Sequence, residues 1–548
     1  MSKKSLLKIF SLVLAILIFA TAFVGCTQKG SSSGDSKTQT SSDSSDSQSK
    51  TDDGSTSSSN SNVLVSDKKI TLKVMARRDP MGGPWENLRI FKDLEEMTNV
   101  HFEFDVVYEG YAEKKNLALA TGDLPDIFLG GITVDDEETY GPQGVLIDLT
   151  DLIEKYGTNM KATFEKYPLL KKSITASDGK IYALGQVLST PTMGSYKPVI
   201  NSNWLKNLNL NVPETTEQLY EVLKAFKTKD PNQNGQADEI PLGEYQFSNL
   251  NGMLLPAFGA MAQDIYVKDG KVIFTPMTDA YKYYLDYIYK LYKEELIDPM
   301  FISQSMDEFL AKTKLNTYGV LGAVRQSDWT QFQMLSPLTS EYNSEKFSSS
   351  TDRVYYTGGL AITKNNKYPV ETIKWADLFF TELDDGIDGI TGAALWIGRR
   401  GVDWDFAEGK SAVKYLFTPE EGQTEIQYLL NKVTPSQSGF IGQLMLDAPF
   451  ESPYLRWVGE NNMKYVFPYI KNDWIYPSGA RFTKEEHEKL SILKTDISKY
   501  VEQERAKFAT GENSLNNWDE YIQTLKNMKV DEFIEIHQNA YDRFMKGN

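Results

Sequence analysis

The chain contains the run Leu117-Ala118-Leu119-Ala120-Thr121-Gly122-Asp123-Leu124-Pro125-Asp126-Ile127. Good helix-forming residues end at Gly122, where the missing Cβ suits the left-handed conformation that closes many helices. A turn containing Pro125 then leads into a short apolar strand that starts at Ile127. The run therefore predicts a helix, a turn and a buried strand in immediate succession.

The residues upstream of this run alternate between strand and helix patterns. Residues 70–74 alternate apolar and polar side chains, as a strand with one buried face does. Apolar residues then recur at helical spacing from Trp85 to Thr98, and residues 101–108 alternate again. This order of strands and helices predicts an α/β fold in which mixed sheets are flanked by helices on both faces.

Helical patterns occupy much of the chain downstream. Expected helices span residues 213–227, 280–292 and 369–381, and two more lie near the C-terminus around Trp518 and Phe533. A chain of 548 residues exceeds what one hydrophobic core comfortably organises. Two lobes are therefore expected.

Composition excludes several classes of function. The chain carries 58 Lys and Arg against 75 Asp and Glu, a formal charge of -17. Nucleic-acid binding draws most of its affinity from cations on phosphates, so no nucleic-acid partner is expected. The single cysteine and 3 histidines exclude a disulfide framework and leave little for a zinc site. The 30 tyrosines and 9 tryptophans supply flat, half-polar surfaces for a ligand or a core.

The first 62 residues predict a targeting signal and a tether. Lysines precede an apolar run over residues 9–24, which predicts a signal peptide over residues 1–25. Cys26 follows directly, and the segment resembles a bacterial lipoprotein lipobox, with Phe23 in place of the usual Leu. This resemblance implies that Cys26 carries a lipid on the extracellular face of the cell membrane. Residues 26–62 are polar and rich in Ser and Asp, which predicts a disordered tether.

The run at residues 117–127 resembles the "lAsGdlPDi" signature of extracellular solute-binding proteins, family 1, which are the substrate-binding lipoproteins of ABC importers. Further stretches resemble the same family in the same order. They lie at residues 144–150, 178–184, 203–208, 517–521 and 540–544. The last two resemble the tail of the large Gram-positive branch, so the resemblance covers nearly the whole mature chain.

The resemblance implies a periplasmic-binding-protein-like fold, in which two α/β lobes joined by a hinge close on a ligand in the cleft. Residues 63–548 would form this solute-binding domain. Lobe 1 is expected near residues 63–195 with 355–410, and lobe 2 near residues 196–354 with 411–548. The family implies a saccharide or oligosaccharide ligand, delivery to an ABC permease and no catalysis. We also expect a monomer.

Residues 230–239 resemble a metal-binding loop. Oxygen-bearing side chains occupy positions 1, 3, 5 and 9 of an EF-hand calcium loop, with Gly235 at position 6, but Pro241 replaces the Glu at position 12. Relatives in the same family carry such a loop with calcium, and by that resemblance Glu239 would supply the missing carboxylate. The alternative is a calcium-free turn whose side chains cap their own backbone. The expected ligands of a structural Ca²⁺ are Asp230, Asn232, Asn234, Gln236, Asp238 and Glu239.

Three tryptophans and one arginine are candidates for contact with the ligand. Sugars stack their C–H faces on aromatic rings and need paired donors and acceptors for their hydroxyls. Trp85 follows a Pro/Gly turn after the first strand, Trp329 comes shortly after Arg325, and Trp396 lies among glycines. Core packing is the alternative for each tryptophan. By contrast, a core position is expected for Trp204, Trp375 and Trp518.

The leading hypothesis is a binding protein without catalysis. The rival is a secreted carbohydrate-active enzyme with a carboxylate pair, although no motif singles out such a pair. A peptide or a lipid-linked ligand is a further alternative. The acidic balance favours neutral sugars over uronates, and a local exception is possible at Arg77, Arg78, Arg399 and Arg400. The histidines stand in no nucleophilic or zinc motif, which favours surface or packing roles.

Overall fold

The computed structural model describes residues 65–547, apart from positions 80, 193–195, 316, 324–328, 436–440 and 448. The expected signal peptide, Cys26 and the tether lie outside the described residues, so they stay predictions. Residues 61–548 form one compact unit, which holds all the described elements.

The strands form two principal sheets and two hairpin-sized ones. Their bounds are β1 Ile70–Arg77, β2 Val100–Val107, β3 Ile127–Leu129, β4 Ala183–Ser189, β5 Val199–Asn201, β6 Ile240–Gly243, β7 Ile265–Lys268, β8 Lys271–Phe274, β9 Tyr318–Leu321, β10 Phe332–Met334, β11 Val354–Ile362, β12 Trp404–Phe406, β13 Val413–Tyr415 and β14 Gly442–Met445. Strands β12 and β13 pair with each other, as do β7 and β8.

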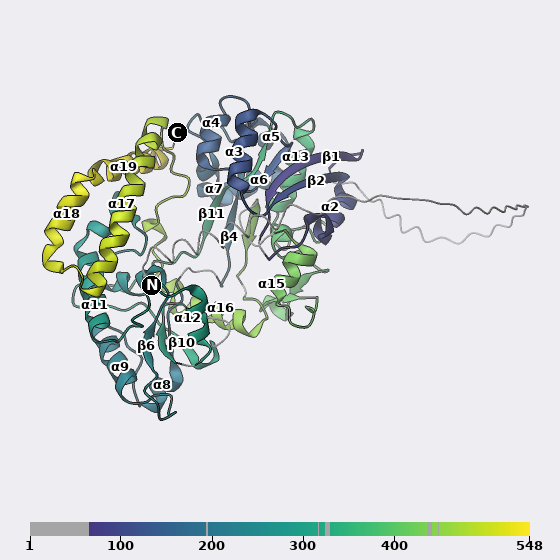
Figure 1. The fold of residues 1–548 in the computed structure, drawn as a ribbon. Coiled ribbons are helices and arrows are strands. Elements are labelled where there is room, and N and C mark those ends of the chain that lie inside the picture. The colour runs from purple at the N-terminus through teal and green to yellow at the C-terminus, as the bar shows by residue number, and fades with distance from the viewer. Residues whose placement is uncertain are drawn as a thin grey trace, which may run out of the picture. The chain divides into compact units, whose positions relative to one another are not determined.

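Helices surround both principal sheets (Figure 1). Their bounds are α2 Arg89–Thr98, α3 Tyr111–Thr121, α4 Val134–Tyr140, α5 Thr150–Tyr156, α6 Thr158–Lys166, α7 Pro168–Ile174, α8 Ser202–Asn207, α9 Thr216–Thr228, α10 Ser248–Phe258, α11 Asp279–Lys293, α12 Met306–Thr313, α13 Pro369–Asp377, α14 Ala394–Ile397, α15 Glu425–Tyr428, α16 Pro453–Tyr465, α17 Lys484–Thr510, α18 Trp518–Asn527 and α19 Val530–Lys546.

The run at residues 117–127 folds as its sequence predicts. Helix α3 ends at Thr121, and Gly122 takes the left-handed conformation with φ 81°. Strand β3 begins at Ile127, which pairs with Val74 of β1 in parallel register. The side chain of Asp126 then accepts a hydrogen bond from the backbone N–H of Lys73, which holds the turn against β1.

The first principal sheet has six strands in the order β14-β4-β11-β3-β1-β2. Strand β1 is parallel to β2 and β3, and β14 is parallel to β4. Only β11 runs against its neighbours β3 and β4. The sheet is therefore mixed, as expected, and we call it with the helices packed on it the first lobe.

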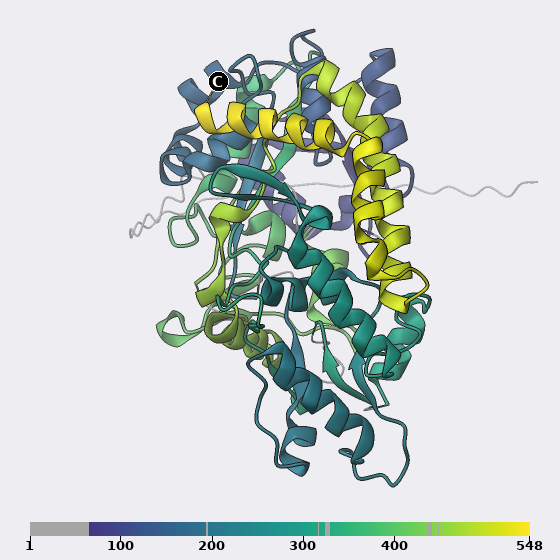
Figure 2. The ribbon, with the colours of Figure 1, turned by 90° about the vertical axis from the view of Figure 1, so that its left-hand side faces the viewer.

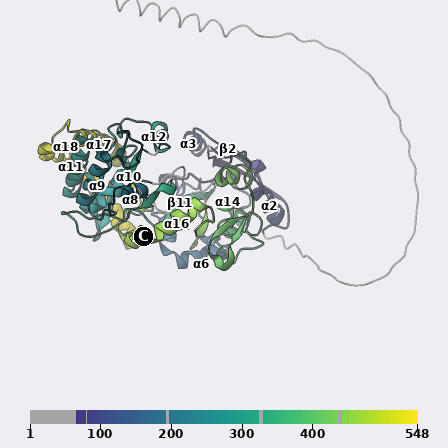
Figure 3. The same ribbon diagram turned by 90° about the horizontal axis from the view of Figure 1, so that it is seen from below.

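The second principal sheet has four strands in the order β10-β5-β9-β6. Strand β9 is parallel to β6, while β5 is antiparallel to both of its neighbours. We call this sheet and the helices packed on it the second lobe. Helices α8, α9, α10 and α11 gather around it (Figure 3).

Both sheets are covered on both faces. Val74 and Met75 are neighbours on β1 but belong to different buried clusters, because successive side chains of a strand point to opposite faces. Val199 and Ile200 divide in the same way on β5. The mixed α/β fold with helices on both faces is thus confirmed. Trp204, Trp375 and Trp518 are buried, as predicted.

The chain leaves the first sheet after Ser189 of β4 and enters the second at Val199 of β5, and it returns between Met334 of β10 and Val354 of β11. The two passages are joined by hydrogen bonds, since the hydroxyl of Ser189 donates to the carbonyl of Asp352 at 2.6 Å. The backbone N–H of Tyr196 likewise donates to the hydroxyl of Ser350 at 3.2 Å.

One expectation about the lobes needs correction. Residues 411–548 were expected in lobe 2, but β14 lies in the sheet of the first lobe, parallel to β4. Strand β14 is only 4 residues long, and a short apolar segment does not indicate which sheet edge it joins.

Candidate functional site

A group of aromatic rings lies beside the second sheet. Trp329 opens a 3₁₀ helix just before β10, and its ring centroid is 5.6 Å from that of Trp457 and 6.4 Å from that of Tyr454. Tyr454 and Trp457 both stand on α16, and all three side chains are half-buried. Tyr245, also half-buried, packs against the same cluster. Partly exposed rings of this kind can stack on a sugar.

A second aromatic group lies beside β4 and β14 of the first sheet. Trp396 on α14 packs with half-buried Tyr356, Phe406 and Tyr415 around a common buried cluster. The group extends through a stack in which the centroids of Phe417 and Tyr428 are 4.5 Å apart. We call these rings the first-lobe aromatic group, and the rings around Trp329 the second-lobe aromatic group.

Helix α16 connects the two aromatic groups. Leu455 packs against the first-lobe group, whereas its neighbour Tyr454 packs against the second-lobe group. Pro453 occupies the first turn of the helix, where its missing N–H costs nothing. Neighbouring side chains of a single helix thus reach both groups, one as a member and one as a packing partner.

Trp396 carries a hydrogen-bond donor that lacks a partner. Its indole N–H is buried, and none of the described residues accepts from it. Leaving such a donor unpaired costs about 1–3 kcal/mol. A ligand hydroxyl or a water that reached this nitrogen would recover that energy.

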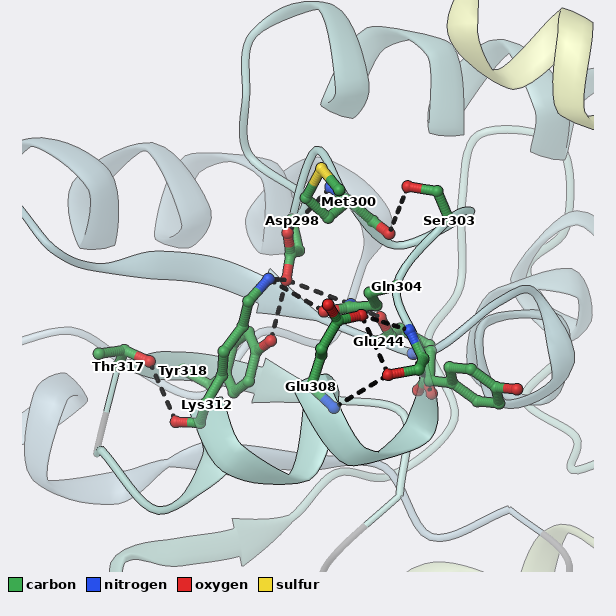
Figure 4. Close-up of polar contacts among 11 residues, drawn as sticks. Glu244, Asp298, Met300, Ser303, Gln304, Glu308, Lys312, Thr317 and Tyr318 are labelled. Carbon is green, nitrogen blue, oxygen red and sulfur yellow. Dashed lines mark hydrogen bonds and ion pairs between the residues drawn. The ribbon is translucent and has the colours of Figure 1, made fainter. Parts of the chain in front are cut away.

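A buried carboxylate holds the backbone that carries Tyr245. Glu244 follows β6 and is 0% exposed. Its Oε1 accepts the backbone N–H of Tyr245 at 2.8 Å and the side-chain amide of Asn249 at 3.1 Å. Gln304 donates to the carbonyl of Glu244 at 2.7 Å (Figure 4). This network fixes Tyr245 relative to the second sheet.

A second buried carboxylate anchors α12 to the same sheet. Oδ2 of Asp298 accepts from Nζ of Lys312 at 2.7 Å and from the hydroxyl of Tyr318 at 2.9 Å, and Figure 4 shows Lys312 reaching to it from α12. Burial, reinforced by Asp298, raises the pKa of Tyr318. Both carboxylates therefore serve the fold of the second lobe and offer no exposed acid pair.

The structure separates the four predicted contact residues. Trp329 and Trp396 lie in the two aromatic groups. Arg325 falls outside the described residues. Trp85 is 1% exposed, and its ring stacks on Phe91 with centroids 5.6 Å apart. The ring of Trp85 therefore lies in the core of the first lobe, which is the core-packing alternative given for it.

Several aromatic residues of the two groups were missed at the level of sequence. Tyr454 and Trp457 are three residues apart on α16, a spacing that places them on one helical face. That signal was available, since Pro453 marks a helix start, but no apolar periodicity accompanies it. Tyr245, Tyr356 and Tyr415 carried no local signal, because their roles depend on which strands pair.

The predicted calcium loop folds into a turn held by its own side chains. Oδ1 of Asp230 accepts the backbone N–H of Asn234 at 3.1 Å, and the side-chain amide of Asn234 donates to Oδ2 of Asp238 at 3.0 Å. Gly235 adopts φ 75°, as a sharp turn requires. Oε1 of Glu239 is buried without a hydrogen-bond partner among the described residues, and burial raises the pKa of this carboxyl.

The oxygen-bearing side chains of residues 230–239 suit a hard cation such as Ca²⁺ only in part. Carboxylate and amide oxygens are the ligands that Ca²⁺ prefers, and Glu239 has an orphaned oxygen. In the part of the chain that the structure covers, however, no three His, Cys, Asp or Glu side chains converge on one metal position.

Among the residues that the structure describes, no helix is long and apolar enough to cross a membrane.

Comparison with known proteins finds relatives along most of the chain. The fructooligosaccharide ABC transporter substrate-binding protein FusA of Streptococcus pneumoniae is 29% identical over 508 residues, which cover 87% of this chain and 91% of FusA. The polygalacturonan/rhamnogalacturonan-binding protein YtcQ of Bacillus subtilis is 25% identical over 87% of this chain and 92% of its own. Lipoprotein LipO of Bacillus subtilis is 31% identical over 44% of this chain and 47% of its own.

Solved structures of FusA are also similar to this chain. Its complex with kestose superposes with a TM-score of 0.68 at 26% identity, covering 87% of this chain and 100% of FusA. An EF-hand mutant of FusA in complex with fructo-nystose gives a TM-score of 0.69 at 26% identity, over 87% of this chain and 100% of that one. Residues 88–382 match the family described as bacterial extracellular solute-binding protein. The two-lobed fold and this match together show that the chain belongs to the bacterial extracellular solute-binding protein family.

Proposed function

We propose that this protein is the substrate-binding protein of an ABC importer, which takes up an oligosaccharide between its two lobes and delivers it to a membrane permease. Relatives named for fructooligosaccharide and for polygalacturonan support a carbohydrate ligand. The observation that carries the proposal is the pair of half-buried aromatic groups connected by α16. Rings from both lobes would stack on successive sugar units as the lobes close.

The charges near these groups favour a neutral oligosaccharide. Arg400 pairs with Asp405 at 2.9 Å and with Asp384 at 3.3 Å. The side chain of Arg399 donates to the carbonyl of Asp388 at 2.6 Å. These two guanidinium groups are therefore already engaged. Since an acidic sugar needs free cations, a neutral ligand suits this surface better.

The proposal includes lipid anchoring and a monomeric state. Acylation of Cys26 would hold the protein on the extracellular face of the membrane, and the polar residues 26–62 would form the tether to the lobes. The lipoprotein LipO among the relatives supports this view.

A structural Ca²⁺ at residues 230–239 also belongs to the proposal. Asp230, Asp238 and Glu239 would supply carboxylates, Asn232 and Asn234 side-chain amide oxygens, and Gln236 its backbone carbonyl. The orphaned oxygen of Glu239 and the EF-hand named in the FusA mutant structure support it. The ion would neutralise like charges and stiffen the loop, without a part in ligand chemistry.

The test measures thermal unfolding and binding with kestose as a neutral probe and oligogalacturonate as an acidic one. We expect kestose to raise the melting temperature, because a ligand at a hundred times its Kd adds about 2.7 kcal/mol to the stability of the folded state. Trp329→Ala and Trp457→Ala should each weaken binding by about 1 kcal/mol or more, roughly fivefold in Kd. Tyr342→Ala, which removes an exposed ring stacked on Tyr283 elsewhere, should bind as the parent does.

Other outcomes would favour the rival functions. Release of smaller sugars in the same samples would establish a carbohydrate-active enzyme. A shift produced by peptides and by neither sugar would establish a peptide-binding protein. If no saccharide of a wider panel shifts the parent, the carbohydrate proposal is wrong.

A further inference from the structure

The C-terminal residues 476–547 form a helical segment that we call the C-terminal strap. Its helices α17, α18 and α19 are the yellow-green and yellow ones in Figure 2. Ile497, Val501 and Phe508 of α17 are buried in the same cluster as Tyr284 of α11, so the body of the strap belongs to the core of the second lobe.

Helix α19 adds contacts to the hairpin β7–β8. The rings of Phe533 and Phe274 lie 5.6 Å apart, and Oε1 of Gln538 accepts the backbone N–H of Val272 at 2.7 Å. This ring contact and this hydrogen bond attach the strap to the β7–β8 hairpin, which precedes α11 in the chain.

Both ends of the strap contact the first lobe instead. Near its start, the hydroxyl of Ser478 donates to the carbonyl of Tyr355 on β11 at 2.9 Å. Near its end, Nζ of Lys172 on α7 donates to the carbonyl of Met545 at 3.0 Å and lies 4.8 Å from the ring centroid of Phe544. The strap therefore spans from one lobe to the other.

A buried ion pair is a further contact between the strap and the first lobe. Arg481 of the strap is 6% exposed and donates to Oε2 of Glu137 on α4 at 2.6 Å, and Glu137 is 0% exposed. A second nitrogen of Arg481 donates to Glu138 at 3.1 Å. Breaking a buried pair leaves a charge without compensation, so this contact resists separation.

Arg481 is itself fixed from within the strap. Arg543 on α19 donates to the carbonyl of Arg481 at 2.9 Å and pairs with Glu486 on α17. The backbone of Arg481, whose guanidinium pairs with α4, is therefore held by α19, and the Arg543–Glu486 pair connects it to α17.

The backbone next to Arg481 approaches α7 very closely. A Cβ on Gly479 would lie 2.4 Å from Cα of Ser173, closer than real atoms allow. The strap thus rests directly on α7 at a position where only glycine fits.

Two surface pockets border this contact. A cavity of about 340 Å³ lies on one side, lined by Lys171, Thr175 and Arg543 among others. A cavity of about 270 Å³, lined by Leu169, Tyr355 and Tyr476 among others, lies on the other side, and Phe544 borders both. The contact of the strap with α4 and α7 is therefore narrow and bordered by two open pockets, whereas the body of the strap is continuously buried in the second lobe.

We propose that Arg481 is a positioning residue for ligand capture. Its ion pairs with Glu137 and Glu138 fix the angle between the lobes, and this angle sets the affinity for the ligand. This inference rests on the proposed function, in which the lobes move on binding. The strap moves with the second lobe, and its contact with α4 and α7 favours one interlobe angle. Loosening that contact changes the population of the binding-competent state without touching the ligand.

The experiment measures the distance between spin labels on the two lobes of the full chain. Cys26→Ser removes the single native cysteine, after which Asn116→Cys on α3 and Glu221→Cys on α9 provide two exposed labelling sites. Arg481→Met and Gly479→Ala loosen the contact by different means, one through charge and the other through backbone crowding. Lys489→Met, which breaks an ion pair between α17 and α19 within the strap, is the matched control.

We expect both loosening variants to shift the ratio of interlobe distance populations about fivefold or more without sugar, and to change the Kd for kestose in proportion. Lys489→Met should match the parent in both measurements. Distances that equal those of the parent in Arg481→Met and Gly479→Ala would overturn the inference. Should Arg481→Met not fold, Gly479→Ala decides alone. If the two variants shift the interlobe distances but the parent binds no saccharide, the inference about the strap stands and the proposed function is refuted.

Discussion

Glu137 is a carboxylic acid enclosed by protein on every side. Burial raises its pKa to about 7, although Arg481 opposes this rise, while Glu138 and Asp136 add to it. Lys115 of α3 pairs with the neighbouring Asp136, and His487 of α17 lies 3.3 Å from Asp135. The local field at this carboxyl therefore depends on α3, α4 and the C-terminal strap together.

The raised pKa makes stability depend on pH. Because the folded state holds the proton of Glu137 more tightly than an unfolded chain with the ordinary pKa of 4.5, this group favours folding most below pH 4.5. That contribution should fall as the pH rises to about 7, by at most about 1.4 kcal/mol per pH unit. Urea unfolding of the parent and of Glu137→Gln across this range checks the effect.

The informative quantity is the difference in the free energy of unfolding between the parent and Glu137→Gln. The stability of the parent relative to Glu137→Gln should decline through this pH window and stay constant above it. A difference that is independent of pH would contradict the raised pKa.

The tryptophans show how far residue-level prediction reaches. Trp204, Trp375 and Trp518 are buried as their helical context predicts. Trp85 follows a Pro/Gly turn and Trp329 stands in a non-periodic segment, yet of these two only Trp329 keeps a partly exposed ring. The difference arises from Phe91 and Phe104, whose rings enclose Trp85. Which rings meet is decided by tertiary packing, so local sequence cannot supply it.

At the scale of elements, helices with strong periodicity were predictable and short segments were not. Helix α9 runs from Thr216 to Thr228 and α11 from Asp279 to Lys293, close to the predicted ranges. Helix α13 ends at Asp377, earlier than predicted, because residues 378–380 tighten into a 3₁₀ turn. Helix α16, which joins the aromatic groups, mixes polar and aromatic residues and carries no clear apolar stripe.

The loop at residues 230–239 yields a prediction for one element. If it binds a structural Ca²⁺, the parent should melt at a higher temperature in calcium buffer than with chelator. Asp238→Ala should lower the melting temperature in calcium to the value that the parent has with chelator. Asp269→Ala, a substitution in the β7–β8 turn, should keep the calcium dependence of the parent. Equal melting temperatures of the parent with and without calcium would refute the site.

At the scale of the whole molecule, the two-lobed architecture was predictable, but its detailed assembly was not. Alternation of strands and helices indicates the α/β class, and chain length indicates more than one core. The placement of β14 in the first lobe and the return of the strap to α4 depend on contacts between distant residues. No local pattern encodes such contacts.

Anchoring is also a property of the whole molecule. In the producing cell, Cys26→Ser should move the protein from the membrane fraction to the medium, because acyl chains would supply the membrane affinity. Fractionation followed by immunoblotting measures this. The released protein should bind its sugar unchanged, since residues 26–62 contain no apolar side chains that could join the site. Retention of Cys26→Ser in the membrane fraction would contradict the lipid anchor.

The edge position of β14 has a consequence for biogenesis. Its partner β4 ends at residue 189, so about 250 residues must leave the ribosome before the two strands can pair. Pairings of such high contact order form slowly. A nascent polypeptide truncated before residue 442 cannot complete its first sheet, so the β14 edge of that sheet is expected to form late in folding.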